Sequence, residues 1–261
     1  MTEAVLLHDD KRKKAFADLF GERYEKSFTD PVAFRTIFFY SPPVSQEYRQ
    51  NFKVLSRNLF AETVYRRRKG FNQEILNHYI AVSGKRLNDI LKLLSLERDR
   101  MREVAYSNGA EIDAGYMHRK EHMIPIIHPH AGLFIKCLEA FDQLLQLSGT
   151  LFLHGIFDSD QRRQVEVKAR GAIRQFSNVI RNESVKMRKE AQRLAKESNG
   201  TDAELDTAIA GQEEAERQAE AQVQADRMGL EIPDGIDPEL ALANAKAAAS
   251  VSRSEEAPQE A

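Results

Sequence analysis

The sequence predicts a mainly α-helical protein with a few short β-strands. Most of the chain before residue 200 repeats apolar side chains at the three- and four-residue spacing of amphipathic helices. Segments rich in aromatic and β-branched residues are few and short, which is typical of isolated strands. Residues 201–261 are rich in Ala, Glu and Gln, and we expect them to form a disordered tail.

Charge divides the chain near residue 200. Residues 1–200 carry 34 Lys and Arg against 25 Asp and Glu, whereas residues 201–261 carry 4 against 15. A basic body indicates an anionic partner such as nucleic acid, and an acidic segment with few aromatic residues indicates a solvated arm. We therefore expect a mostly helical DNA-binding body over 1–200 and a low-complexity tail over 201–261.

The N-terminal part predicts two strands and a helix. Ala4–His8 alternate weakly between apolar and polar residues, which indicates a short strand, and Asp10–Phe20 have helical spacing up to Gly21. Phe34–Tyr40 are aromatic and β-branched, and they predict a second strand. Pro42 and Pro43 end it, since proline donates no backbone hydrogen bond.

Two long amphipathic helices are predicted next, over Ser45–Lys69 and Phe71–Tyr106. Between them lies a cationic run of four residues, Arg66, Arg67, Arg68 and Lys69. This run has two interpretations. It is a solvated helix end, favoured by the negative end of the helix dipole, or it contacts phosphate groups.

The next segments predict a strand followed by two helices. Met117–Ile127 begin with polar residues and end with branched aliphatic ones, which indicates a strand. His130–Leu147 form a strongly apolar helix, and Ser159–Lys196 form a basic one with Asp158 or Ser159 as its N-cap. This strand-helix-helix core extends over about 117–197.

Four histidines in thirteen residues suggest a zinc site: His118, His122, His128 and His130. His118 and His122 would converge on a helix. The prolines and the aliphatic alternation of this stretch favour extended backbone, however, where a spacing of four residues separates side chains by roughly 13 Å. We therefore expect no metal site.

Motifs of catalysis are missing from the sequence. It contains no Gly-rich phosphate loop, no G-x-S-x-G, no H-E-x-x-H and no Walker lysine. The acidic residues Glu139 and Asp142, with Lys136 nearby, are expected on a solvated or salt-bridged helix surface. We expect neither an enzyme nor a cofactor.

No apolar run reaches the about 18–20 residues that a membrane span needs, and the N-terminus lacks the pattern of an export signal. The sequence therefore predicts a cytoplasmic protein without a membrane partner.

Strand, helix and helix in this order are the parts of a ribbon-helix-helix DNA-binding motif. In that motif one strand from each of two protomers pairs antiparallel, and the ribbon enters the major groove. Alternation sends His118, Lys120 and His122 to one face and Arg119 to the other, and either face could read bases. Arg162 and Arg163 stand at the start of the second helix, where phosphate contacts are expected. The other interpretation of Met117–Ile127 is an ordinary edge strand.

Three segments resemble the AcaB-type transcriptional regulators of conjugative plasmids and integrative conjugative elements. They are VLLHDDKRKKAFADLFGERY, IPIIHPHAGLFIKCLEAFDQLL and HGIFDSDQRRQVEVKARGAIRQFSNVI. The resemblance implies a ribbon-helix-helix homodimer that binds promoter DNA and activates genes for conjugative transfer, together with other regulators or RNA polymerase. Ordinary ribbon-helix-helix regulators are much shorter than this chain, which leaves room for another role.

An alternative function is a non-enzymatic helical interaction protein or an accessory subunit of a conjugation or DNA-processing complex. Its long helices would pack on partner helices, and its acidic tail would attract basic partners. The operator sequence, the choice between activation and repression, and any small-molecule effector stay open at the level of the sequence.

Overall fold

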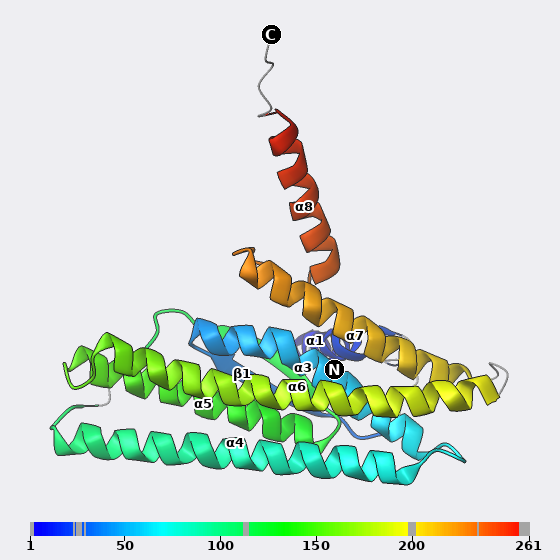
Figure 1. Ribbon diagram of the computed structural model, residues 1–261, viewed down its shortest axis with the longest axis horizontal. Helices are drawn as coiled ribbons and strands as arrows, with labels where there is room; N and C mark the ends of the chain where they lie inside the picture. Colours follow the sequence, from blue (N-terminus) through cyan, green and yellow to red (C-terminus); the bar gives the residue numbers. More distant parts are fainter. Residues whose placement is uncertain are drawn as a thin grey trace.

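The computed structural model describes residues 3–22, 24, 28, 30–111, 115–197, 202–233 and 235–255, and of 3–9 and 249–255 the backbone alone. The described residues form seven helices and two strands, which confirms the mainly helical prediction. In chain order they are α1 (Glu3–Phe20), β1 (Ala33–Phe39), α3 (Pro42–Arg66), α4 (Gln73–Ser107), β2 (Lys120–Ile126), α5 (Pro129–Leu153), α6 (Ser159–Glu197), α7 (Ala203–Arg227) and α8 (Pro238–Glu255). Figure 1 shows the long helices α4, α5 and α6 side by side, with α8 projecting from the body.

The predicted strand over Ala4–His8 is wrong, because these residues belong to α1. Alternation over five residues is too short to distinguish a strand from one and a half helical turns, and Ala4, Leu6 and Leu7 favour a helix. The helix ends at Phe20, and Gly21 follows with φ +96°, as predicted.

The two strands pair with each other within the chain. The antiparallel register runs from Ala33 opposite Ile126 to Phe39 opposite Lys120. The face that carries Ile37, Phe39 and Ile124 is buried against the helices, and the opposite face points outward. The strand, helix, helix order of β2, α5 and α6 is as predicted, but β2 has its ladder partner in β1 instead of in a second protomer.

Helix α3 lies at the centre of the molecule, where it contacts α1, β1, α4, α5, α6 and α7. It begins at Pro42, earlier than predicted, because proline fits the first turn of a helix, which has no intrahelical partner for the N–H. The core beneath it is continuous and apolar. Phe52, Tyr65, Phe134 and Phe141 are among its largest buried side chains.

Residues 203–227 of the predicted disordered tail are ordered, so the expectation needs correction there. They form α7, which packs along α3. Most of its buried side chains are alanine or glutamine and recur at helical spacing, together with two large apolar ones: Leu205, Ala208, Ile209, Gln212, Ala215, Ala219, Gln222 and Ala225. Alanines give a weak hydrophobic signal, yet they let two helices approach closely. Residues 198–201, 234 and 256–261 of this region lie outside the described residues.

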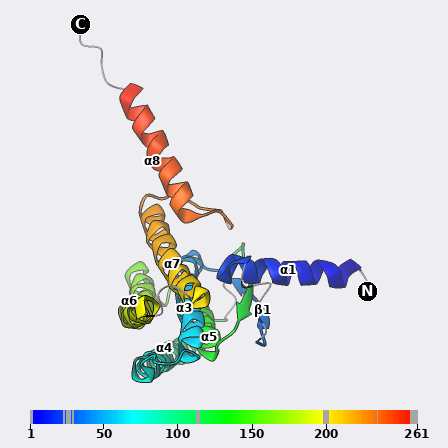
Figure 2. The same cartoon turned by 90° about the vertical axis from the view of Figure 1, so that its right-hand side faces the viewer.

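Helix α8 leaves the body after a turn and packs on α7 (Figure 2). Leu242 is buried against Ala221 and Ala225, whereas Leu240 is exposed. None of the helices that the structure describes is both long and apolar enough to cross a membrane.

Candidate nucleic-acid interface

The outward face of the β1–β2 ribbon carries two arginines over aromatic rings. The guanidinium carbon of Arg119 lies 4.3 Å from the ring centroid of Phe38, and that of Arg12 lies 5.5 Å from the centroid of Phe34. Thr36 stands between the two rings on the same face of β1 and is exposed. Stacking on an aromatic ring fixes the orientation of a guanidinium group.

Cations of α1 and α3 extend this surface. Lys11, Lys14, Arg49 and Lys53 line a groove of about 590 Å³ beside β2. Burial is the main cause that lowers the pKa of Lys53. Figure 2 shows α1 and β1 together on one side of the helical bundle.

Acidic groups also reach this groove. Asp18 of α1 and Glu121 of β2 line it together with the lysines. The α1 cations were not among the predicted site residues. The run Lys11–Lys14 nevertheless contains four consecutive cations, as the run Arg66–Lys69 does.

His122 is turned towards the protein, which corrects its predicted role in reading DNA. Its ring centroid lies 4.6 Å from that of Tyr48 and 5.8 Å from that of Phe39. The predicted alternation is right, but the face with His122 packs on α3. Lys120 is exposed at the start of β2, and His118 is exposed just before it.

Arg162 and Arg163 lie in the first turn of α6, as predicted. Arg162 lies over Phe152, with 5.4 Å between its guanidinium carbon and the ring centroid, and it hydrogen-bonds Tyr116 in the segment before β2. Arg163 is exposed, and its Nε lies 3.9 Å from Asp160. The structure therefore brings the start of α6 next to the approach to the ribbon.

The cap of α6 is the predicted Asp158. Its carboxylate accepts a hydrogen bond from the backbone N–H of Gln161 at 2.7 Å, and the side chain of Gln161 accepts one from the N–H of Asp158 at 2.9 Å. This reciprocal pair is a capping box. It fixes the first turn of the helix and hence the backbone that carries Arg162.

The cationic run Arg66–Lys69 is largely paired within the protein. Arg66 binds Glu62 and Asn77, and Arg67 binds Asp30. Arg68 binds Asp202 and Glu204 at the start of α7. This pairing matches neither interpretation, because Arg66, Arg67 and Arg68 bind acidic residues of the same chain instead of water alone or phosphate groups. Lys69 is exposed and has no ion pair among the described residues.

His128 and His130, the other two histidines of the predicted cluster, lie at the start of α5. Nδ1 of His128 accepts a hydrogen bond from the N–H of His130 at 3.1 Å, which caps the helix. His130 lies 2.9 Å from the hydroxyl of Ser83 and packs over Gly84 of α4. Burial lowers the pKa of both imidazoles, that of His128 to about 4.

Asp142 is buried, which corrects its predicted place on a solvated surface. Its two oxygens accept hydrogen bonds from the N–H groups of Tyr40 and Ser41 at 3.0 and 2.9 Å, at the start of α3. Glu139, in contrast, forms the expected partly exposed ion pair, with Arg35 of β1 at 2.8 Å. Sequence spacing places both acids on α5 but does not show that the junction between the end of β1 and the start of α3 contacts Asp142.

Comparison with known proteins gives one structural likeness. No family model and no curated protein matches the sequence. The fold is similar to the crystal structure of selenomethionine-containing AcaB from uropathogenic E. coli, with a TM-score of 0.61 and 21% sequence identity. The match covers 72% of this chain and 99% of that one. The chain therefore has the fold of AcaB over most of its length.

Proposed function

We propose that the protein is a sequence-specific transcriptional regulator that binds double-stranded DNA and has no enzymatic activity. The observation that carries this proposal is the outward face of the β1–β2 ribbon, with Arg119 over Phe38 and Arg12 over Phe34. A two-stranded antiparallel ribbon can enter the major groove, which is about 12 Å wide and presents a distinct pattern at each base pair.

In this proposal the charged groups have two tasks. Arg119 lies at the approach to the ribbon, over Phe38 of the outward face, where a side chain can reach base edges. Lys120 is exposed at the start of β2, on the face that Phe39 shares. Arginine suits guanine, because its two N–H groups match the O6 and N7 acceptors.

Arg162 and Arg163 stand in the first turn of α6, where the helix dipole favours anions such as phosphate groups. The carboxylates of Asp158 and Asp160 lie in the same region, so the phosphate contacts depend on the two arginines.

The structural likeness to AcaB and the three sequence segments that resemble AcaB-type regulators support a more specific role. We propose activation of genes for conjugative transfer from promoter DNA, with other regulators or RNA polymerase as partners. The protein acts as a homodimer in this proposal. Since β1 takes one edge of β2, a second protomer can pair with β2 only along the edge that faces away from β1.

The test compares a ribbon residue with a helix residue on two kinds of DNA. A preferred site is first selected from random-sequence duplexes with the full-length protein. Arg119→Ala should then cost about 1–3 kcal/mol on that site and much less on random DNA. Arg163→Ala should weaken both about equally and reduce the salt slope by about one.

Lys85→Ala is the matched control, because Lys85 is an exposed cation of α4, outside the ribbon, outside α6 and outside the cationic run Arg66–Lys69. It should change neither affinity measurably. Equal losses on selected and random DNA for Arg119→Ala would contradict base reading by the ribbon. Failure to select any preferred site would contradict sequence-specific binding altogether.

A second candidate is an accessory or interaction protein of a conjugation or DNA-processing complex. The observation that favours it is α8, which projects from the body with Leu240 exposed (Figure 1). Such a protein would bind DNA weakly and without sequence preference, whereas a regulator prefers its site by several orders of magnitude and weakens steeply as salt rises. The selection experiment therefore separates the two functions.

A further inference from the structure

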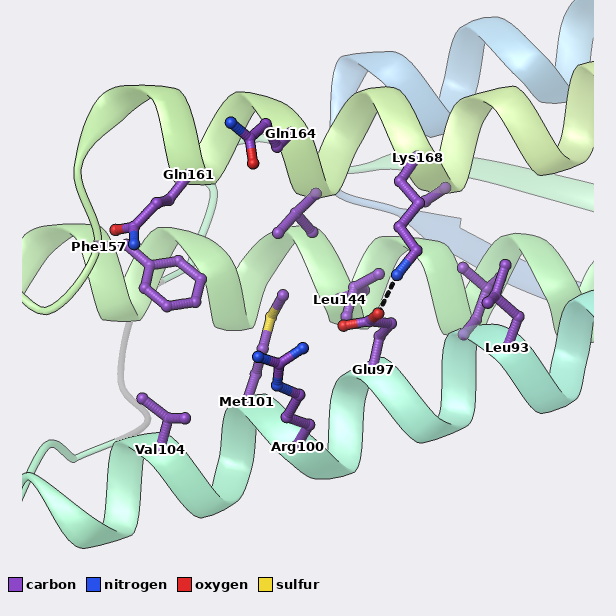
Figure 3. A pocket seen from close by; sticks show the side chains of 13 residues that line it. Leu93, Glu97, Arg100, Met101, Val104, Leu144, Phe157, Gln161, Gln164 and Lys168 are labelled. Carbon is purple, nitrogen blue, oxygen red and sulfur yellow. Dashed lines mark hydrogen bonds and ion pairs between the residues drawn. The ribbon is translucent and has the colours of Figure 1, made fainter.

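A cavity of about 270 Å³ lies between α4, α5 and α6, away from the ribbon (Figure 3). Its walls are mostly apolar. They comprise Leu94, Met101, Val104, Leu144, Phe157 and Val165. A concave apolar space with a few converging polar groups is the usual form of a small-molecule site, although this one is at the small end of the range.

The polar groups at the rim differ in whether the protein already uses them. Lys168 and Glu97 form an ion pair with each other, so their charges are matched. Arg100 forms no ion pair with any described residue, and Figure 3 shows its guanidinium pointing from α4 into the space between the helices. The rim therefore has one unmatched positive charge.

Two amide side chains of α6, Gln161 and Gln164, also line this space (Figure 3). Gln161 uses its side-chain oxygen to accept the N–H of Asp158, which leaves its NH₂ group to donate. Gln164 makes no side-chain hydrogen bond with the described residues and lies one turn further along α6. An arginine and two amide donors around an apolar space are complementary to a carboxylate on an apolar body.

We propose that this cavity binds a small amphipathic carboxylate, with the apolar body between α4, α5 and α6 and the carboxylate held by Arg100 at the rim. A volume of about 30 Å³ per water-sized atom gives room for about nine non-hydrogen atoms. A straight-chain or branched monocarboxylate of about eight carbons is of this size. Octanoate is the probe that represents the class.

The first experiment separates the charge from the apolar body. Octanoate and the neutral octanol are titrated into the full-length protein, with binding measured by calorimetry and by chemical shifts of the methyl groups of Leu144 and Val165. Wild type should bind octanoate about tenfold more tightly than octanol, as expected for one charge-assisted contact. Arg100→Gln should remove this preference, and Arg102→Gln, an exposed cation one position beyond Met101, should keep it.

The second experiment fills the space. Val165 lines the cavity and Val167 is exposed two residues later, so Val165→Phe and Val167→Phe form a matched pair. Val165→Phe should abolish octanoate binding, and Val167→Phe should leave it unchanged. If Val165→Phe does not fold, the Arg100 and Arg102 pair still decides, because those side chains lie at the rim.

Three outcomes would overturn the proposal. Wild type that binds no octanoate at millimolar concentration has no such site. Octanoate binding that survives both Arg100→Gln and Val165→Phe occurs elsewhere. Self-association of the wild type that these two substitutions abolish, without octanoate binding, would mean that a second protein copy covers the cavity. None of these outcomes depends on whether the protein binds DNA.

Discussion

Asp142 joins the middle of α5 to the start of α3. Ser41 is the N-cap residue of α3, but its side chain does not cap the helix. The carboxylate of Asp142 accepts hydrogen bonds from the N–H groups of Tyr40 and Ser41 instead, in a buried position. One side chain from a distant helix thereby supplies the cap that the local sequence lacks.

Asp142→Ala leaves two buried N–H groups without an acceptor. We expect it to lower the free energy of unfolding by about 3 kcal/mol, the sum of modest penalties for each unmade bond. Urea unfolding followed by circular dichroism measures the loss. Glu139→Ala is the control, because its ion pair with Arg35 is partly exposed and should be worth less than about 1 kcal/mol. Equal losses in the two variants would contradict the capping role.

His128 makes stability depend on pH. Its cap on α5 requires an unprotonated Nδ1, and burial, with His130 and Arg66 nearby, lowers its pKa to about 4. An unfolded chain protonates histidine near pH 6.5. Between about pH 6.5 and 4 the unfolded state therefore binds more protons, so stability is present above about pH 6.5 and is lost as the pH falls through this window.

His128→Asn should reduce this loss, since asparagine is a good N-cap that does not titrate. The measurement is the urea midpoint at several pH values between 4 and 7. Part of the decrease in the urea midpoint at low pH should persist, because burial also lowers the pKa of His130. The exposed His118→Asn serves as control. If the urea midpoint of His128→Asn falls with pH as steeply as that of the wild type, protonation of His128 is not the cause of the pH dependence.

Helix α7 is held to α3 by a buried hydrogen-bonded group of three side chains. The hydroxyl of Tyr65 donates to Oε1 of Gln212 at 2.6 Å, and Nε2 of Gln212 donates to Asn58 at 2.8 Å. All three residues are buried. The group fixes the position of α7 along α3 more specifically than the small alanines around it can.

Gln212→Ala should lower the free energy of unfolding by about 2–4 kcal/mol, because it leaves the polar groups of Tyr65 and Asn58 buried without a partner. Gln224→Ala, at an exposed position of the same helix, should change it by less than about 0.5 kcal/mol. Removal of residues 203–261 should destabilise the body strongly, whereas removal of residues 238–261 should not. A body that keeps its stability without α7 would contradict this packing.

Elements with strong periodicity could be predicted from the sequence, and elements held by distant contacts could not. The helices α4, α5 and α6 have large apolar residues at regular spacing, so their positions follow directly from the pattern. Helix α7 was missed because its buried face consists mostly of alanine and glutamine, which give little hydrophobic periodicity. The packing of α7 depends on contacts with Tyr65 and Asn58 of α3, and the local sequence of α7 cannot show these contacts.

The candidate interface was predicted in part for the same reason. Strand β2 and the basic start of α6 were predicted from their sequences. Arg162 lies in the first turn of α6 as expected, whereas Arg119, which was predicted within the strand Met117–Ile127, lies just before β2. The pairing of β2 with β1 joins residues far apart in the chain, and it decides which face of the ribbon is outward. That pairing turned His122 inward and brought Arg12 of α1 to the outer face, which spacing within one strand could not show.

At the scale of the whole molecule, part of the opposite charge of the two chain regions is paired inside the fold. Arg68 binds Asp202 and Glu204, and Arg188 of α6 binds Glu216 of α7. Part of the acidic region is therefore bound to the basic body instead of extending into solvent, as its composition had indicated. Exposed cations that can still face an anionic partner include Lys11 and Lys14 of α1, Arg119 beside the ribbon and Arg163 in the first turn of α6.

The proposed homodimer is tested by sedimentation equilibrium of the full-length protein. A mass of twice 29.7 kDa is expected at micromolar concentration, and binding to a selected palindromic site should require two chains. In a homodimer each protomer would place its ribbon on one half-site of the palindrome. Contact with two half-sites raises specificity for the site. A monomer that binds its selected site with full specificity would rule out the dimer.

The central position of α3 has a consequence for synthesis on the ribosome. Helix α3 is translated before α5, α6 and α7, which cover much of its surface. The apolar side chains of Phe52, Leu59 and Tyr65 therefore stay open to water or to chaperones while more than half of the chain is still being made. Contacts between such distant segments also form slowly. Folding is thus completed late, when the last helix to pack on α3 leaves the exit tunnel.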